Sequence, residues 1–348
     1  MLIYWLMFWF PFIGTITPRK MVGTQSAVIF ILVCAAFAIV IGLRDAVGGD
    51  WPNYLPMFNY YSTENFTEIL DSTDPGYALL NWSVERVGGG IYAVNLACAV
   101  LMMLGVCRFC LSLPDPWLAL LVAVPYMLIV VGMGYTRQAV ALGAVMYGLA
   151  YLGQGRTLPF VLCVVFGGTF HHSAVLLVPV AGLATSKNRI WTATWVALAF
   201  AAAYFVLLQP ESENLWKNYV TDQGTFSSGA VQRALMNAVP AVLLLVLRKR
   251  FAQELQVRRL WIIFCWLALA CLPFISLAST AVDRMGLYLL PLQLFVFSRM
   301  PDLTKQVVGR TAIVAGVVAY YGIVQYVWLN YAVMRNFWVP YGFMPFSD

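Results

Sequence analysis

Long apolar runs follow one another along nearly the whole of this 348-residue chain, and they restrict its fold more than any other feature. A membrane-crossing helix needs about 20 mostly apolar residues. The runs lie at about 1–17, 24–43, 91–112, 117–134, 137–153, 157–170, 172–186, 189–208, 231–247, 260–279, 285–298 and 311–333. Hydrophobic residues make up 61% of the chain and charged residues 10%, whereas soluble domains have about 45–50% and about 25%. The pattern predicts an integral membrane protein.

The fold class that we expect is all-α. Open sheet edges are excluded from lipid because their backbone groups would be unpaired, and the alternation that a membrane barrel needs is absent. We predict one polytopic membrane domain over residues 1–348, a bundle of about 12 transmembrane helices. The outer loops 44–90 and 209–230 are its subsidiary elements. The first 17 residues lack a basic n-region and a cleavage site, which favours a retained first span.

Basic residues separate the connections into two sets. One set has a net charge of +11 and only three acids, and the other has a net charge of −5. Cytoplasmic loops carry the excess of Lys and Arg, so we expect the first set inside and both termini outside. The basic residues of the first set are Arg19, Lys20, Arg108, Arg156, Lys187, Arg189, Arg248, Lys249, Arg250, Arg258, Arg259, Arg299, Lys305 and Arg310.

The two histidines of the chain, His171 and His172, are adjacent and lie within apolar sequence. Residues 157–186 have basic residues at both ends, so a single helix there would put one basic cluster on the wrong side. Two short helices that meet near the histidines restore the alternation and bring both imidazoles to the outer tip of a hairpin. Neighbouring residues on a helix point about 100° apart, so we expect one of the two to face a cavity.

Three outer arginines lie at the ends of apolar runs: Arg44, Arg137 and Arg284. Ionisable residues at membrane depth are costly and mark function by default. We read Arg137 and Arg284 as residues that open helices, where free N–H groups favour anions. A guanidinium binds phosphate oxygens bidentately. Together the three arginines predict a site for a phosphate-bearing ligand, while the alternative for each is that it reaches singly to the interface.

The outer loop 44–90 is acidic and aromatic. Apolar residues at helical spacing between Tyr77 and Val87 predict a helix that lies in the membrane interface. Aromatic rings beside Asn and Asp also suit a sugar-binding groove, although an interfacial aromatic belt explains them as well. We expect Arg233 to be a solvated loop end and Asp283 to orient Arg284.

Six short motifs along the chain resemble, in order, the pattern of the EpsG-like exopolysaccharide polymerases, relatives of the Wzy-type polymerases. The motifs are GLRDAVGGDWPNY, DPGYALLN, YTRQAVALG, FHHSAVLL, DRMGLYLLP and FWVPYGF, and they span residues 42 to 343. The resemblance implies a GT-C-like membrane glycosyltransferase in the bacterial cytoplasmic (inner) membrane, with an outer-face cavity that faces the periplasm or exterior.

The resemblance also implies the reaction. Such enzymes join oligosaccharide repeat units that are carried on undecaprenyl diphosphate, so that the growing chain leaves its lipid diphosphate and is transferred to a hydroxyl of the next unit. The expected partners are the undecaprenyl-diphosphate oligosaccharide donor and acceptor, the lipid bilayer and a chain-length regulator protein; no nucleic acid is expected. The sugars and the linkage stay open.

This chemistry needs charge stabilisation of the leaving diphosphate and a general base for the attacking hydroxyl. We assign the diphosphate to Arg137 and Arg284, with Arg44 next. The catalytic candidates are His171, His172 and Asp50, and Asp74 is a further candidate base. The other substrate-binding candidates are Gln138, Tyr288, Asp74, Tyr77 and Tyr54. No carboxylate cluster of the kind that holds Mg²⁺ is visible, so we expect no cofactor and no metal.

Two other functions are consistent with a polytopic protein that has these residues. A multi-spanning acyltransferase also uses histidine and arginine near a membrane face, but here the candidate groups are expected on the side away from cytosolic acyl-CoA. A transporter or flippase of lipid-linked oligosaccharides predicts polar residues through the bilayer depth or a repeat of halves, and the sequence has neither.

Overall fold

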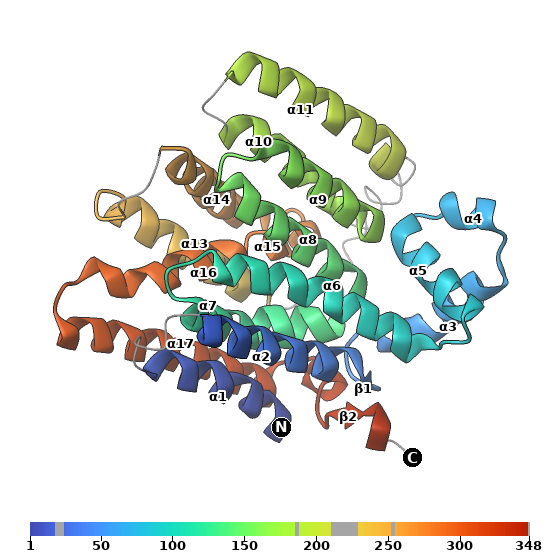
Figure 1. Cartoon of the computed structure of the whole chain (residues 1–348), viewed down its shortest axis with the longest axis horizontal. Coiled ribbons are helices and arrows are strands. Elements are labelled where there is room, and N and C mark those ends of the chain that lie inside the picture. Colours follow the sequence, from blue (N-terminus) through green and yellow to red (C-terminus); the bar gives the residue numbers. More distant parts are fainter. Residues whose placement is uncertain (18–23, 185–187, 210–228, 252–254, 347–348) are drawn as a thin grey trace.

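A computed structural model describes residues 1–17, 24–184, 188–209, 229–251 and 255–346 (Figure 1). The predicted all-α membrane fold is confirmed, because nearly every apolar run forms helix. The elements are α1 (Leu2–Ile16), α2 (Thr24–Gly42), β1 (Arg44–Asp45), α3 (Trp51–Thr63), α4 (Phe66–Leu70), α5 (Pro75–Arg86), α6 (Ile91–Leu111), α7 (Pro116–Ala123), η2 (Val124–Gly132), α8 (Thr136–Leu152), α9 (Thr157–Phe170), η3 (His172–Leu177), α10 (Val178–Ala184), α11 (Arg189–Ala203), η4 (Tyr204–Leu208), α13 (Ala230–Leu247), α14 (Leu255–Phe274), α15 (Ser279–Leu287), α16 (Pro291–Arg299), η7 (Met300–Leu303), α17 (Val307–Tyr331), η8 (Arg335–Phe337), β2 (Gly342–Phe343) and η9 (Met344–Phe346).

Six of the described helices are long and apolar enough to cross a membrane. They comprise Gln25–Gly42, Ile91–Leu111, Arg189–Leu207, Ala230–Leu247, Val257–Phe274 and Val307–Tyr331. Shorter apolar helices cover Leu2–Ile16, Pro116–Gly132, Thr157–Phe170 and His172–Ala184. The protein is therefore a multi-pass membrane protein, and the number of twelve spans stays a prediction.

The centre of the bundle is held together by small residues. α8 packs between α6 and α9, and an added Cβ at Gly105 of α6 would lie 1.8 Å from the carbonyl oxygen of Gly143 on α8. Small residues let two membrane helices approach closely and gain van der Waals contact. α8, which carries Arg137 at its start, is thereby one of the most buried helices of the molecule.

The C-terminal residues pack behind the loop that follows α2. β1 and β2 pair antiparallel, with Arg44 opposite Phe343. The Trp338 indole N–H donates to the carbonyl oxygen of Ile129 at 2.9 Å, and the hydroxyl of Tyr4 donates to the carbonyl oxygen of Trp338. These contacts join the two ends of the chain to η2, so the motif FWVPYGF is part of the wall that supports the loop 44–50.

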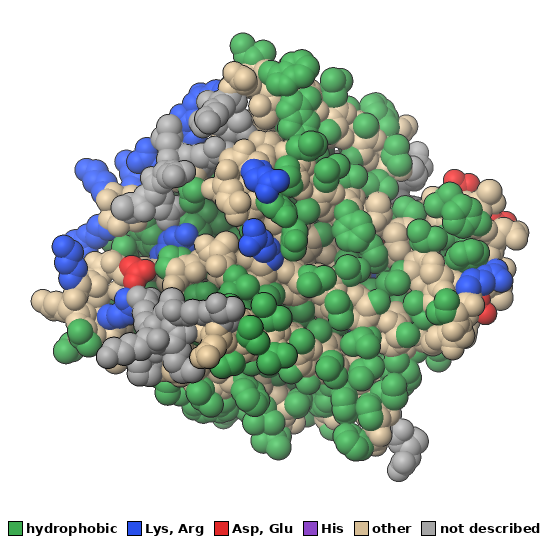
Figure 2. Space-filling view, in the orientation of Figure 1, with side chains coloured by type: hydrophobic (Ala, Val, Ile, Leu, Met, Phe, Trp, Pro, Cys, Tyr) green, Lys and Arg blue, Asp and Glu red, His purple; other side chains and the backbone are tan. Residues whose placement is uncertain are grey.

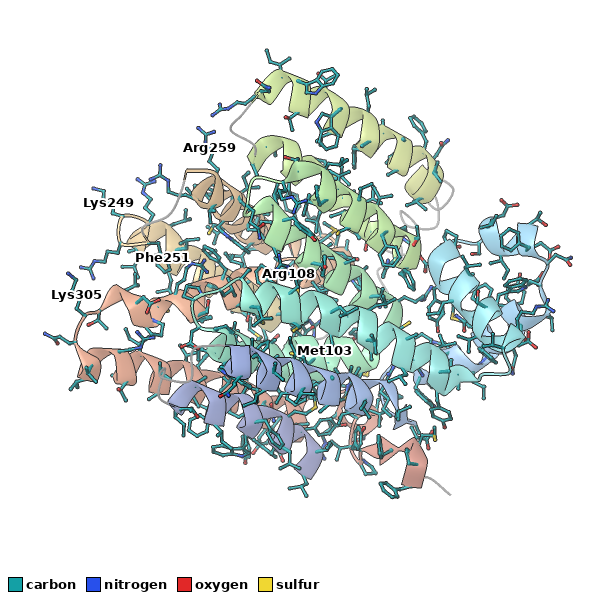
Figure 3. All side chains as sticks on the ribbon, in the orientation of Figure 1. Met103, Arg108, Lys249, Phe251, Arg259 and Lys305 are labelled. Carbon is teal, nitrogen blue, oxygen red and sulfur yellow. The ribbon has the colours of Figure 1, made fainter. Side chains whose placement is uncertain are left out.

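Charged side chains are unevenly distributed over the visible face. Lys and Arg gather at the left-hand end in Figure 2, most of the acidic side chains lie at the right-hand tip over α3–α5, and hydrophobic side chains cover much of the surface between. Lys249, Arg259 and Lys305 all lie at the left-hand end (Figure 3). This separation agrees with the division of the loops into a basic and an acidic set.

Two expectations about helices need correction. The apolar run 285–298 is not one helix, because α15 ends at Leu287 and α16 begins at Pro291. Arg284 consequently lies in the last turn of α15 and does not open a helix. The carbonyls at this end attract cations. The predicted outer loop 209–230 lies almost wholly outside the described residues.

The predicted interfacial helix is present as α5, Pro75–Arg86. It packs against α3, α4 and α9, and its buried residues Tyr77, Ala78 and Asn81 face these neighbours. Its position at the membrane interface stays a prediction.

Candidate functional site

A polar cavity of about 140 Å³ lies where α3, α5, α8, η3 and α15 meet. Its walls bring together residues from five separate parts of the chain. The lining residues are Asp50, Tyr54, Thr73, Asp74, Tyr135, Arg137, Gln138, His171, His172 and Arg284. All the candidate residues that the sequence indicated line this one cavity except Arg44, Tyr77 and Tyr288.

Arg137 is held at the first turn of α8. The backbone N–H of Thr136 donates to the Tyr54 hydroxyl at 2.7 Å, which satisfies one of the free donors of this helix start. The guanidinium NH1 donates to Asp74 Oδ2 at 2.6 Å. The Arg137 side chain is 34% exposed, so the cavity reaches the surface beside a charged and positioned guanidinium.

Asp74 is brought to the cavity by the motif DPGY. Pro75 begins α5 and Asp74 is its N-cap residue, but the carboxylate makes no capping bond. It lies in the cavity and is 2% exposed. An added Cβ at Gly76 would lie 2.3 Å from Thr169 Oγ1. Glycine at this position therefore lets the start of α5 lie against the end of α9, next to the histidines.

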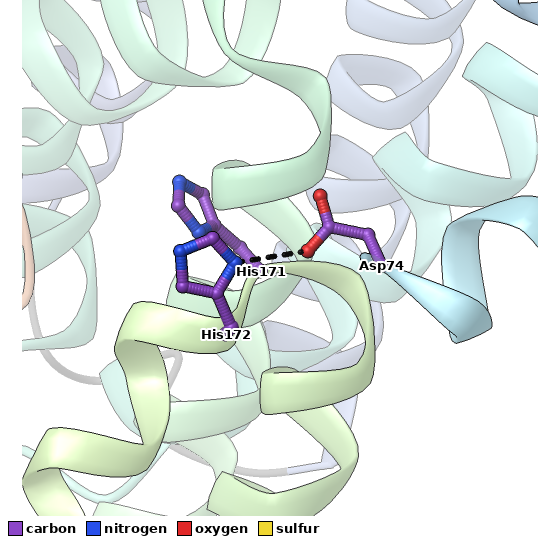
Figure 4. Close-up of side chains that lie close together, drawn as sticks. All are labelled: Asp74, His171 and His172. Carbon is purple, nitrogen blue, oxygen red and sulfur yellow. Dashed lines mark ion pairs between the residues drawn. The ribbon is translucent and has the colours of Figure 1, made fainter. Parts of the chain in front are cut away.

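His171 and His172 lie between α9 and α10 at the junction that the sequence predicts. His171 has an extended backbone, with φ −154° and ψ 107°, and His172 begins the short 3₁₀ helix η3. The expectation that one imidazole faces the cavity is wrong, because His171 is not helical and both rings line the cavity. The ring centroids are 5.1 Å apart (Figure 4).

Asp74 and the histidines form a cluster. His172 Nδ1 is 3.5 Å from Asp74 Oδ1, the pair marked in Figure 4. His171 Nδ1 is 3.3 Å from the Ser173 hydroxyl, which in turn lies 3.1 Å from the hydroxyl of Tyr288. Tyr288 thus supports His171 from behind the cavity through Ser173.

The protonation states in the cavity follow from burial and neighbouring charge. Burial alone would raise the pKa of Asp74, but the interaction with His172 and the charge of Arg137 outweigh it and hold this pKa below its ordinary value. Burial lowers the pKa of His171 to about 3, although Asp74 opposes the change. At neutral pH Asp74 is therefore ionised and His171 is neutral.

Asp50 lines the cavity from the loop between β1 and α3, far from the histidines in sequence. Its backbone N–H donates to the carbonyl oxygen of Gly134 at 3.4 Å. Burial raises the pKa of the Asp50 carboxyl, and this change is opposed by the charges of Arg284 and Arg137 and by a hydrogen bond with Tyr54.

Arg284 and Gln138 bind each other twice. Arg284 NH1 donates to Gln138 Oε1 at 3.0 Å, and Gln138 Nε2 donates to the backbone carbonyl of Arg284 at 3.0 Å. The guanidinium carbon lies 4.6 Å from the centre of the Tyr135 ring. Because Gln138 follows Arg137 directly, this pair brings the two arginines to the same cavity from α8 and α15.

A buried chain of polar side chains supports the same turn of α15. Asn237 Nδ2 donates to the carbonyl oxygen of Gly286 at 2.8 Å. Gln293 Nε2 donates to Asn237 Oδ1 at 2.8 Å, and the Tyr321 hydroxyl donates to Gln293 Oε1 at 2.7 Å. The last carbonyls of a helix have no partner within the helix, so the side chains of α13, α16 and α17 fix the backbone on which Arg284 stands.

Arg44 has a different environment from the other two arginines. It is fully buried, and it donates to the carbonyl oxygens of Ile41 and Val47 and to the Thr136 hydroxyl at 2.7–3.1 Å. It does not line the cavity, so its geometry fits a structural role between α2 and the start of α8. Tyr77 likewise lies behind the cavity, with Arg137 6.0 Å from its ring centre.

Other residues of the site were not expected or were expected in other roles. Thr73 and Tyr135 line the cavity; Thr73 directly precedes the motif DPGYALLN, and Tyr135 is the first residue of the motif YTRQAVALG. Asp283 forms an ion pair with Arg233. Arg233 is therefore not a solvated loop end. Asn237, Gln293 and Tyr321 lie within apolar runs, where a single polar residue gives no sequence signal of its partners.

The fold and the cavity together define a class, a multi-pass helical membrane protein with paired arginines, aspartates and histidines in one pocket. The model of the EpsG family matches residues 27–343, so the chain belongs to the EpsG family. Membership indicates an exopolysaccharide polymerase-type membrane protein with a role in exopolysaccharide biosynthesis. A search of curated proteins and a search of solved structures gave no match.

Proposed function

We propose that this protein is a polysaccharide polymerase that joins undecaprenyl-diphosphate-linked oligosaccharide repeat units on the outer face of the bacterial cytoplasmic membrane. It is a glycosyltransferase of the GT-C-like class in which the lipid diphosphate is the leaving group. The observation that carries this proposal is the convergence of Arg137, Arg284 and Asp50 in one cavity, in a chain that belongs to the EpsG family.

The two arginines bind the diphosphate. In the transfer, the bond between the anomeric carbon of the growing chain and a phosphate oxygen breaks, and negative charge develops on that oxygen. Positioned cationic donors stabilise such charge. Arg137 is fixed by Asp74, and Arg284 is fixed by Gln138. Both guanidinium groups are therefore oriented before the substrate arrives.

Asp50 is the general base. The attacking hydroxyl of the next repeat unit forms the new bond to the anomeric carbon, and its proton passes to the Asp50 carboxylate. A base works best when its pKa lies close to the operating pH. Burial raises the pKa of Asp50 in that direction, whereas the pKa of His171 is lowered to about 3. Tyr54, Thr73 and Tyr135 give the cavity hydroxyl groups and rings for the sugar.

The test is a polymerisation assay with purified full-length protein in lipid nanodiscs and a synthetic undecaprenyl-diphosphate repeat unit. We expect a ladder of products whose spacing equals one repeat unit, together with released undecaprenyl diphosphate in equal number to the bonds formed. Absence of a ladder from folded protein, with the cognate repeat unit of the same bacterium, contradicts the proposal.

The same assay separates the two other functions. An acyltransferase would change the mass of the repeat unit without changing its chain length. A flippase would leave single units unchanged in mass, and with the protein in sealed lipid vesicles in place of nanodiscs it would move them between the two leaflets. In cells, loss of a polymerase leaves single lipid-linked units on the outer face, whereas loss of a flippase leaves them on the inner face.

A further inference from the structure

We infer that Asp74, His171 and His172 form a binding site for a divalent transition-metal ion, with open coordination positions toward the cavity. The three side chains each offer one ligand atom, and these atoms all lie within 4.8 Å of one another. The sequence indicated no metal because the aspartate and the histidines are almost 100 residues apart and form no carboxylate cluster.

The first support is that the cluster contains buried polar atoms without a hydrogen bond. Among the described side chains, Asp74 Oδ1 and both ring nitrogens of His172 are buried and lack a hydrogen bond. Buried polar atoms almost always have a partner, and an exception calls for an unseen water or ion. His172 is 8% exposed and lines the cavity, so ring nitrogens that lack a hydrogen bond there point to a missing ligand.

The second support is geometric. The distance of 3.5 Å between His172 Nδ1 and Asp74 Oδ1 is longer than an N–H···O hydrogen bond of about 2.7–3.2 Å. An ion bonded to both atoms at about 2.1 Å would see them at roughly 110°, which is the tetrahedral angle that zinc sites adopt. His171 offers the third ligand atom, which lies within 4.8 Å of the other two.

The third support is charge. Asp50 and Asp74 balance Arg137 and Arg284 among the residues that line the cavity, so a diphosphate would enter without surplus positive charge. A bound divalent cation supplies two positive charges beside Arg137. Three protein ligands leave positions that a phosphate oxygen can occupy, as in catalytic metal sites.

The donor set indicates the class of metal. Mg²⁺ and Ca²⁺ prefer oxygen ligands, whereas two imidazoles and one carboxylate suit Zn²⁺, Mn²⁺, Fe²⁺ or Co²⁺. Asp74 is already oriented for this, because the Arg137 ion pair holds Oδ2 while Oδ1 faces His172. Ser173 and Tyr288 hold His171 from the other side, which is the kind of support that metal ligands commonly have.

The experiment measures Co²⁺ and Zn²⁺ binding to tag-free, chelator-treated full-length protein in nanodiscs, without any lipid-linked substrate. We expect one equivalent of metal to bind per chain. The visible absorption bands of bound Co²⁺ should be those of an ion with a low coordination number. His172→Ala and His171→Ala should each weaken binding at least ~10-fold. Asp50→Asn is the matched control, because it removes a carboxylate of the same cavity that is outside the cluster, and it should leave metal binding unchanged.

Folding of each variant is checked by size-exclusion profile and thermal melting in the absence of metal. No uptake by wild type, or equal uptake by wild type and both histidine variants, overturns the inference. If a histidine variant does not fold, His172→Gln takes its place, because it keeps volume and polarity but loses the imidazole donor.

The phosphate half of the inference rests on the proposed function, and inorganic pyrophosphate is its probe. We expect protein loaded with one equivalent of Co²⁺ to bind pyrophosphate at least ~10-fold more tightly than metal-free protein, since binding of the two ligands is reciprocally coupled. Product ladders that persist in protein shown to be free of metal would contradict a role of the metal in the reaction and would still support the polymerase function. Metal uptake without product ladders would contradict the polymerase function and would still support the metal site.

Discussion

Arg137 and Arg284 both line the cavity, and in the proposed reaction they bind the diphosphate. We expect Arg137→Ala and Arg284→Ala each to lower the polymerisation rate by about 10²–10³, the usual cost of one donor to a developing oxyanion, while the protein stays in the membrane. The measurement is product length and rate in the ladder assay. Arg86→Ala is a matched control, because this arginine of α5 is mostly exposed and lies outside the cavity.

Wild-type polymer levels in both cavity variants would refute the diphosphate assignment. Arg137→Lys refines the test. It keeps the charge but loses the planar fork that binds Asp74 and phosphate together, so we expect an intermediate rate.

If Asp50 is the general base, it sets the pH dependence of the polymerisation rate. Its carboxylate is the active form, so activity is full above the pKa and falls as the pH drops through it. Burial raises this pKa, so the acid limb should lie above that of an ordinary aspartate near pH ~4. His171 adds no ionisation between pH 5 and 8, because its pKa is lowered to about 3. The measurement is the initial rate of the purified enzyme against pH.

Asp50→Asn should remove the acid limb and lower the rate at least ~100-fold, the usual contribution of a general base. Residual activity that keeps the wild-type limb would assign the limb to another group and remove Asp50 from this role.

Most of the candidate residues that the sequence indicates line one cavity, but the sequence does not predict their partners. Charge, imidazole and position beside an apolar run are local properties, and they identify Arg137, Arg284, Asp74 and both histidines. Arg44 has the same local properties, yet its donors are used on backbone carbonyls and Thr136. Only the placement of Thr136, at the start of α8, next to Arg44 distinguishes this buried arginine from the two that line the cavity.

At the scale of elements, α5 depends on the approach of its first turn to α9. Gly76→Ala would put a Cβ 2.3 Å from Thr169 Oγ1. The start of α5 must then move away from α9, which increases the distance between Asp74 and His172. We expect at least ~10-fold loss of polymerisation, since small misplacements at a site are costly. Gly90→Ala is the control, because a Cβ there meets nothing within 4 Å. The measurement is the initial rate.

The double variant with Thr169→Ala removes the nearest clashing atom, so part of the activity should return. Equal activity of Gly76→Ala and wild type would mean that the contact between α5 and α9 does not position Asp74.

The polar chain behind α15 gives a second prediction about an element. Asn237→Leu removes the donor to the Gly286 carbonyl and loosens the turn that bears Arg284. We expect kcat to fall about 10-fold. A double-mutant cycle with Arg284→Ala is decisive. If Asn237 acts through Arg284, Asn237→Leu causes no further loss of kcat once Arg284 has been replaced. Fully additive losses would show that Asn237 acts elsewhere. Tyr321→Phe, at the far end of the chain of bonds, should have a smaller effect.

Hydropathy predicts most helices to within a few residues, because the apolar runs end where polar loops begin. It misses the break between α15 and α16. The run from Met285 to Ser298 is apolar on both sides of the turn at Tyr288–Leu290, so composition does not change there, and Pro291 is the one local sign of a new helix. Because of this error, hydropathy predicts Arg284 at the start of a helix, where free N–H groups lie, whereas it stands in the last turn of α15, near carbonyl groups that have no partner within the helix.

At the scale of the whole molecule, the cavity exists because five segments meet. Asp50 and Arg284 are separated by most of the chain, and no spacing rule brings them together. What the sequence does predict at this scale is the sidedness of charge, which Figure 2 and Figure 3 agree with. The cavity lies where α3, α5, α8, η3 and α15 meet, and α3–α5 lie at the end of the molecule away from Lys249 and Lys305.

This arrangement predicts the orientation of the protein in the membrane. Basic connections stay in the cytoplasm, so Lys249 should lie inside, and Thr67 of α4, at the acidic end, should lie outside. Both side chains are exposed. In a chain whose seven native cysteines are replaced, Thr67→Cys should react with a membrane-impermeant maleimide in intact cells, and Lys249→Cys should react only after the membrane is opened. Reaction of Lys249→Cys in intact cells would invert the topology. The cavity beside α5 would then face the cytoplasm, where a polymerase of units already carried across the membrane finds no substrate.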